Sequence, residues 1–165
     1  MTSMLIFSKN TMPQHIVLIE PEIPNNTGNI GRLSLATGST LHLVKPFGFE
    51  LNDKRVKRAG LDYWQHLDLK IYESQEAFFE THKGKPMAFF SSHGTKEYWE
   101  VDFQEDHFFI FGKESVGLSE NLLESHRDET YKIPIHSTHI RSINLANAVT
   151  AVVYEGLRQR SQKLR

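Results

Sequence analysis

The sequence contains no cysteine, and this absence removes several classes of protein. Disulfide-linked scaffolds, cysteine-ligated zinc sites, iron–sulfur clusters and thiol nucleophiles all need that residue. No apolar run approaches the roughly 20 residues of a membrane-spanning helix. The apolar patch Met4–Phe7 is shorter than a secretory signal requires. We therefore expect a cytoplasmic protein with no membrane partner. One domain over residues 15–165 follows residues 1–14, which are either a disordered extension or the result of a misplaced start site.

An excess of charge of one sign is missing as well. Nineteen Lys and Arg residues face 20 Asp and Glu residues, so the net charge is -1 with histidine neutral. A chain this balanced does not hold nucleic acid by bulk charge alone, although a local basic patch is compatible with it. The 165 residues, 39% of them hydrophobic, fit one globular domain.

Common catalytic and nucleotide-binding motifs are also absent. No G-x-G-x-x-G follows a strand-like run, and no G-x-S-x-G elbow is present. Gly112–Ser115 is similar to part of a phosphate-binding loop, but His107 stands where the first glycine is needed. His136 and His139 are three residues apart in a loop without a nearby carboxylate. They could be metal ligands, but a solvated loop is the favoured interpretation, and we expect no metal.

What the chain does contain is a series of short apolar runs that predict buried strands. The five runs are His15–Glu20, Thr40–Lys45, Met87–Ser92, His107–Phe111 and, more weakly, Thr130–Ile135. Runs that are apolar on both faces and separated by helical stretches are typical of parallel sheets. The pattern predicts an α/β domain with a mostly parallel sheet and helices on both faces.

Two segments predict helices. Asn25–Gly38 has Asn26 or Thr27 as a candidate cap and a glycine suited to a left-handed stop. Ser142–Arg158 is the strongest helix prediction, with Ser142 as its cap, and its apolar residues form two adjacent stripes. So wide an apolar arc faces more than one partner. Either the whole arc packs inside one subunit, or the second stripe contacts another copy of the chain.

Three polar segments follow strand-like runs. Pro24–Arg32 has amides and glycines that suit close backbone approach to a ligand. Phe111–Leu118 follows the strongest strand, and open α/β sheets bind ligands at the carboxyl ends of their strands. Arg141–Ala148 leads from the last strand-like run into the long helix. Each segment alone is compatible with an ordinary turn, but their order and spacing together are specific.

Together these segments resemble a known family. Asn26-x-Gly28-x-x-x-Arg32, Gly112-x-Glu114-x-x-Gly117 and Ser142-x-Asn144 look like the three motifs of SpoU-type SPOUT RNA 2′-O-methyltransferases. The resemblance runs from about Ile16 to Gln159 and is strongest with the small single-domain branch that methylates the tRNA wobble ribose. The branch-like stretches are Glu20–Pro24, Asp53–Arg55, Arg58–Tyr63 and Val153–Glu155.

The resemblance implies a fold and a site that the residue pattern alone does not give. It implies a carboxyl-terminal trefoil knot, which general topology rules would not suggest, bound S-adenosylmethionine and an obligate homodimer. The residues that it assigns to the cofactor are Phe90, Gly112, Ile133 and Ser142. The residues that it assigns to catalysis are Arg32, Asn26, Glu114, Ser142 and Asn144.

Two basic clusters bear on the substrate. Asp53–Arg58 carries four basic residues against one Asp, and the tail from Tyr154 to Arg165 carries four against one Glu. Such clusters are commonly solvated faces. Two of them in a chain without a separate RNA-binding domain support RNA as the substrate, and we expect no DNA partner. The expected RNA contacts are Lys54, Arg55, Arg58 and Tyr154.

These observations lead to one expected function and two alternatives. The resemblance implies methyl transfer from S-adenosylmethionine to the ribose 2′-hydroxyl of tRNA nucleotide 34, a cytidine or modified uridine of tRNA-Leu. The alternatives are a ribosomal RNA ribose as the target, or a knotted RNA-binding protein without catalysis. Because arginine has a pKa above about 12, we expect Arg32 to stabilise a developing alkoxide or the adjacent phosphate, with a base role left open.

Overall fold

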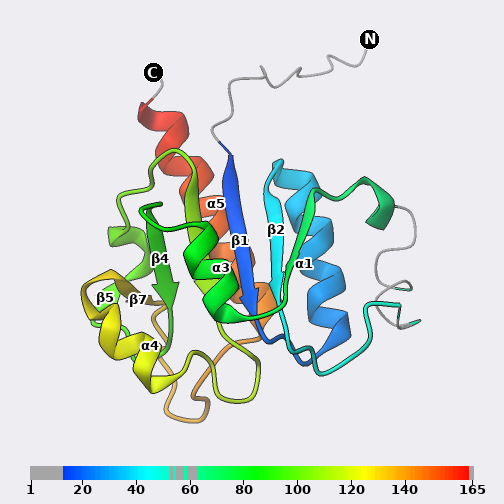
Figure 1. Ribbon diagram of the computed structural model, residues 1–165. Helices are drawn as coiled ribbons and strands as arrows, with labels where there is room; N and C mark the ends of the chain where they lie inside the picture. The colour runs from blue at the N-terminus through cyan, green and yellow to red at the C-terminus, as the bar shows by residue number, and fades with distance from the viewer. Residues whose placement is uncertain (1–12, 53, 55–57, 59–62, 164–165) are drawn as a thin grey trace.

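A computed structural model gives the structure of residues 13–52, 54, 58 and 63–163 (Figure 1). The strands are β1 (Gln14–Ile19), β2 (Thr40–Val44), β3 (Leu69–Tyr72), β4 (Met87–Phe90), β5 (Lys96–Glu97), β6 (His107–Phe111) and β7 (Thr130–Lys132). The α-helices are α1 (Pro24–Thr37), α3 (Gln75–Thr81), α4 (Glu120–Ser125) and α5 (Leu145–Lys163). Short 3-10 helices are η1 (Trp64–His66), η2 (Tyr98–Glu100) and η3 (Arg127–Glu129).

The described strands form one sheet in the order β3-β2-β1-β6-β4-β7-β5. Every adjacent pair is parallel, as the apolar runs predicted. β3 and β5 were not among the predicted strands, because β3 is only partly buried and β5 has two residues. The predicted strand Thr130–Ile135 is too long, since β7 ends at Lys132. The predicted α/β class is confirmed.

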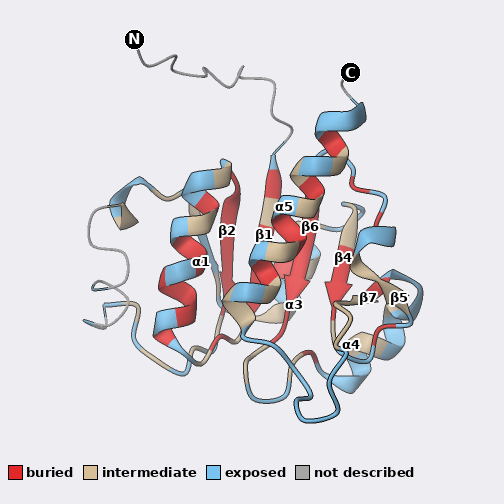
Figure 2. Ribbon diagram, turned by 180° about the vertical axis from the view of Figure 1, so that it is seen from behind, coloured by how far each residue is buried: buried red, intermediate tan, exposed pale blue. Residues whose placement is uncertain are grey.

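The core lies on both faces of this sheet. Along β1, Ile16 and Leu18 pack on one side, whereas Val17 and Ile19 pack on the other. Helices α1 and α5 cover the first face, and α3 and α4 cover the second (Figures 1 and 2). This alternation follows from the two-residue period of side chains along a strand.

Both predicted helix starts need correction. α1 begins at Pro24, and Ile23 precedes it without a side-chain cap. Proline suits the first helical position because it has no N–H to leave unpaired, so neither Asn26 nor Thr27 is the cap. α5 begins at Leu145 rather than Ser142, and its cap is Asn144, whose Oδ1 accepts the Asn147 N–H at 3.2 Å.

The boundary of the predicted amino-terminal extension needs correction. Gln14 was placed in the amino-terminal extension but lies in β1 and is 2% exposed, while residues 1–12 lie outside the described residues.

The apolar arc of α5 is partly accounted for within one chain. Val152 and Val153 come from different stripes and both are fully buried, whereas Ala146 and Leu157 of the second stripe are only partly buried. The contact of the second stripe with another copy stays a prediction.

The connections place several loops at one edge of the sheet. The strand order reverses between β1 and β6, because β2 and β3 lie to one side of this pair and β4 and β7 to the other. Parallel strands bring their carboxyl-terminal loops to the same edge, and ligands of open α/β sheets bind where the order reverses.

Candidate active site

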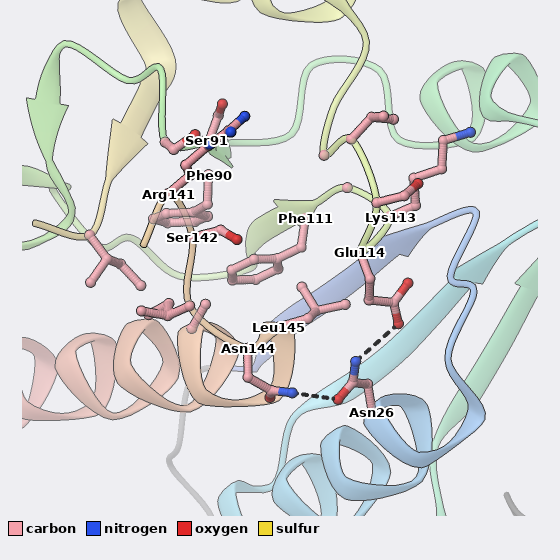
Figure 3. A pocket seen from close by; sticks show the side chains of 18 of the residues that line it. Asn26, Phe90, Ser91, Phe111, Lys113, Glu114, Arg141, Ser142, Asn144 and Leu145 are labelled. Carbon is pink, nitrogen blue, oxygen red and sulfur yellow. Dashed lines mark hydrogen bonds between the residues drawn. The ribbon is translucent and has the colours of Figure 1, made fainter. Parts of the chain in front are cut away.

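A cavity of about 540 Å³ lies at this edge of the sheet. Its walls come from the loops after β4, β6 and β7 and from the first turns of α1 and α5 (Figure 3). The predicted site residues in its walls are Asn26, Phe90, Gly112, Glu114, Ile133, Ser142 and Asn144. Segments more than a hundred residues apart in the sequence thus meet at one cavity, as the three motifs predicted.

Three motif side chains form a hydrogen-bonded row beside the cavity (Figure 3). Asn144 Nδ2 donates to Asn26 Oδ1 at 3.0 Å, and Asn26 Nδ2 donates to Glu114 Oε1 at 3.2 Å. The Glu114 carboxylate also accepts the backbone N–H groups of Glu22 at 2.8 Å and Ile23 at 3.0 Å. One residue of each motif is therefore fixed by the next.

The loop after β6 can approach α1 because it turns tightly. A Cβ at Gly112 would lie 2.1 Å from the carbonyl carbon of Gly117, so position 112 has room only for glycine. Gly117 has a φ of 71°, in the left-handed region that glycine adopts without strain. Its N–H donates to the Lys113 carbonyl at 2.8 Å, which closes the turn.

An ion pair lies at the base of the same loop. Lys113 Nζ is 3.0 Å from Glu20 Oε2, and Gln75 Nε2 donates to the other oxygen of Glu20 at 2.9 Å. The hydrogen bond from Lys113 lowers the pKa of the Glu20 carboxyl against the opposing effect of its partial burial, and Gln75 lowers it further. Glu20 therefore holds the start of the loop as a carboxylate.

The walls of the cavity suit a nucleoside-containing ligand. The Phe90 and Phe111 rings stack with centroids 4.9 Å apart, and Ser91, Ser92 and Arg141 add polar groups. Ligand pockets typically measure about 300 to 1,000 Å³ and combine apolar walls with a few polar groups. This volume, the aromatic wall and the polar groups fit S-adenosylmethionine, and the four residues that the resemblance assigns to the cofactor all line the cavity. No group of three or more His, Asp or Glu within the described ranges is placed to hold a metal ion.

The predicted catalytic arginine and the predicted RNA contacts that the structure describes lie outside the cavity. Arg32 is on the exposed side of α1, outside the cavity, with its guanidinium 5.5 Å from the centroid of the Tyr63 ring. Lys54 and Arg58 are exposed, and Tyr154 on α5 is 51% exposed. Arg55 lies outside the described residues. The structure thus brings together at the cavity the predicted catalytic residues other than Arg32.

Sequence reasoning missed several residues at this site. Ser91, Ser92 and His93 follow β4, and Arg141 precedes the third motif, yet none received a role. The signal for the first three was available, because β4 was predicted and its carboxyl end belongs to the ligand-binding edge. Glu22 stands in the quoted stretch Glu20–Pro24 after β1, but its contact with Ser115, 93 positions away, had no local signal.

No helix that the structure describes combines the length and apolar character needed to cross a membrane.

The fold and cavity define an α/β domain with a candidate ligand site at the reversal of its strand order. Residues 13–154 match the SpoU rRNA methylase family, and the chain belongs to that family.

Three known proteins illustrate the similarity. The tRNA (cytidine(34)-2′-O)-methyltransferase of Yersinia pestis is 43% identical over 151 residues, which cover 88% of this chain and 93% of that protein. A solved structure described as giving insight into 2′-OH methylation of C/U34 on tRNA has 43% identity and a TM-score of 0.87, with 92% and 98% covered. The SpoU methyltransferase AviRb from Streptomyces viridochromogenes, in complex with the cofactor AdoMet, has 27% identity and a TM-score of 0.77, with 88% and 57% covered.

Proposed function

We propose that this protein transfers a methyl group from S-adenosylmethionine to the ribose 2′-hydroxyl of tRNA nucleotide 34, a cytidine or modified uridine of tRNA-Leu. The observation that carries the proposal is the row of Asn26, Glu114 and Asn144, which joins all three motifs beside one cavity. The names of relatives more than 40% identical over nearly the whole chain support nucleotide 34 over a ribosomal RNA ribose.

The residues of the cavity have distinct tasks in this proposal. Bound S-adenosylmethionine would supply an already activated methyl group, so transfer needs in-line positioning more than a strong nucleophile. Phe90, Gly112, Ile133 and Ser142 hold the cofactor. Asn26 and Glu114 keep the loop after β6 and the start of α1 in register, and Asn144 holds the start of α5 against them.

Arg32 is assigned to the ribose rather than to the cofactor. A fixed positive charge stabilises the alkoxide that develops as the hydroxyl loses its proton. Because the side chain is exposed and outside its own cavity, we assign it to the cavity of a second copy in a homodimer. Lys54, Arg55, Arg58 and Tyr154 contact tRNA, and the trefoil knot belongs to the same proposal.

Nucleoside analysis of tRNA tests the function. Total tRNA from a strain that lacks the gene should lose one 2′-O-methyl nucleoside at position 34 of tRNA-Leu, and the gene should restore it. Loss of a ribosomal RNA 2′-O-methyl nucleoside with tRNA unchanged would favour the alternative target. No change in either RNA would favour a knotted RNA-binding protein without catalysis.

Mixed dimers test the assignment of Arg32. Arg32→Ala and Asn26→Ala chains should each be inactive alone. If Arg32 acts at the partner's cavity, random mixing of equal amounts restores about a quarter of the sites, because half of the dimers are mixed and each has one intact site. If Arg32 acts at the cavity of its own chain, no site regains both residues and mixing restores nothing.

A further inference from the structure

Glu22 and Glu114 lie 92 positions apart and bind each other's loops. The Glu22 carboxylate accepts the Ser115 N–H at 2.9 Å through Oε2 and the Ser115 hydroxyl at 2.9 Å through Oε1. The Glu114 carboxylate in turn accepts the N–H groups of Glu22 and Ile23. We call these four hydrogen bonds between residues 22–23 and residues 114–115 the carboxylate clamp.

The clamp joins the two loops whose relative position shapes the cavity. Ile23 immediately precedes α1, which contains Asn26 and Arg32, and Ser115 belongs to the loop after β6 that lines the cavity. Hydrogen bonds in which a carboxylate accepts are shorter and stronger than those between neutral groups. Because each loop supplies both a carboxylate and N–H donors, neither loop can shift without breaking bonds from both sides.

Glu20 provides a second reason to regard this connection as a built feature. Its φ of 53° lies in the left-handed region, which is unfavourable for a residue with a Cβ. Such a conformation persists where the surrounding contacts determine it, and such residues cluster at functional sites. Here the Glu20 carboxylate receives Lys113 from the loop after β6 and Gln75 from α3. The segment after β1 therefore holds the loop after β6 at two points, through Lys113 and through Ser115.

We propose that Glu22 is a positioning residue, which acts through Ser115 to hold the loop over residues 112–117 in the shape that binds the cofactor. The inference rests on the proposed function for the identity of that cofactor, but the clamp itself is a property of this chain. Glu22 acts on the loop backbone, and the residues that face the cavity are its neighbours Ile23 and Ser115. A misplacement of about 1 Å in a site can cost on the order of a hundredfold in rate.

The first test measures the loop without any cofactor. Hydrogen exchange of the peptide that contains Ser115 should be faster in Glu22→Ala than in the wild type, because the N–H has lost its acceptor. Exchange in α3, on the other face of the sheet, should be unchanged. Glu80→Ala is a matched control, because it removes an exposed carboxylate that lies on α3 and is not part of the carboxylate clamp. Unchanged exchange at Ser115, or faster exchange throughout the chain, would overturn the proposal.

The second test measures cofactor binding by calorimetry with S-adenosylmethionine. Glu22→Ala should weaken binding by about tenfold, and Glu22→Gln by less, because the amide keeps one acceptor oxygen. Ser115→Ala should have the smallest effect, since the N–H bond to Glu22 stays. The KM for the cofactor should rise more than kcat falls. Equal affinities for wild type and Glu22→Ala would overturn the proposal.

The two tests also separate this inference from the proposed function. A wild-type protein that binds no S-adenosylmethionine, with or without tRNA, would contradict the proposed function, whereas the exchange of Ser115 would still decide whether Glu22 holds the loop. A wild-type protein that binds the cofactor, together with a Glu22→Ala protein that binds it equally well, would contradict only the role of Glu22.

Discussion

Two polar networks lie at different places on the sheet, and they differ in what surrounds them. The cavity network consists of Asn144, Asn26, Glu114, Glu22 and Ser115, and it borders an open volume of about 540 Å³. The histidine relay consists of Asp106, His15, His42, Tyr72 and His82, on the face that α3 covers. The first joins loops through carboxylates and amides, whereas the second joins strands and a helix through imidazoles.

The relay is a chain of four short hydrogen bonds. His15 Nε2 is 2.7 Å from Asp106 Oδ1, and His42 Nδ1 is 2.9 Å from the Tyr72 hydroxyl oxygen. The same hydroxyl oxygen is 2.8 Å from His82 Nε2. The two histidine nitrogens of His15 and His42 are 2.9 Å apart. The Asp106 carboxylate accepts from His15. One set of tautomers satisfies every bond in one direction, with each ring or hydroxyl donating toward Asp106 and accepting from the next group.

The surroundings decide what each network can do. His15 stacks on Phe108 with centroids 4.1 Å apart, and Phe78 lies against His42 and Tyr72. Burial lowers the pKa of His42 to about 3, so this imidazole is neutral at physiological pH. Removing a member of the relay should therefore cost stability, whereas removing a member of the cavity network should change ligand binding and turnover.

The largest expected effect concerns Arg32, which belongs to neither network. Arg32→Ala should reduce methyl transfer about 100- to 1000-fold, or roughly 3–4 kcal/mol, because it removes a charge from the developing alkoxide. Calorimetry should find nearly wild-type affinity for S-adenosylmethionine, since the residue is outside the cavity. Weaker tRNA binding with normal turnover at saturating tRNA would instead make Arg32 a docking residue.

His42→Ala tests whether the histidine relay contributes to the stability of the protein and not to methyl transfer. The substitution removes the bonds that His42 makes to His15 Nδ1 and to the Tyr72 hydroxyl, and it removes a ring from the core, at a cost of about 2–4 kcal/mol. Urea denaturation measures the change. Methyl transfer at a temperature well below the unfolding midpoint should stay close to wild type. A large loss of transfer by a fully folded protein would show that the relay also serves the site.

The burial of His42 and His107 predicts how the free energy of unfolding depends on pH. The folded protein holds the pKa of His42 at about 3 and that of His107 at about 4, against an ordinary value of 6.5. Below about pH 6.5 the unfolded chain binds protons that the folded chain does not, so the free energy of unfolding falls as pH decreases toward 4. His42→Gln, which cannot titrate, should flatten this dependence in urea denaturation at several pH values. An unchanged slope would contradict the assignment to His42.

The smallest expected effect concerns the exposed basic residues. Replacing Lys54 and Arg58 together by alanine should weaken tRNA binding and reduce its salt slope by up to about 0.9 per lost phosphate contact, less on single strands. Turnover at saturating tRNA should be largely preserved. Filter binding at several salt concentrations measures the slope. Wild-type affinity and slope would remove these residues from the tRNA contact.

The central strands could be predicted from sequence because their signals are local. β1, β4 and β6 are continuous apolar runs, and the polar motifs after β1 and β6 indicated a shared site. The cap of α1 could not be predicted correctly, because the Asn26 side chain is bonded to distant residues. It donates to Glu114, 88 positions away, and accepts from Asn144, 118 positions away. The relay was equally hidden, since His15 and Asp106 are separated by 91 positions and neither belongs to a motif.

The most direct test of whether the cavity is the active site is to compare methyl transfer to nucleotide 34 by the wild type and two variants. Wild type, Asn26→Ala and His42→Ala would be incubated, well below their unfolding midpoints, with methyl-labelled S-adenosylmethionine and tRNA from the strain lacking the gene. We predict label in a 2′-O-methyl nucleoside at position 34 with wild type and His42→Ala, and little with a folded Asn26→Ala. No label at position 34 with wild type, or equal label with wild type and Asn26→Ala, would contradict this account.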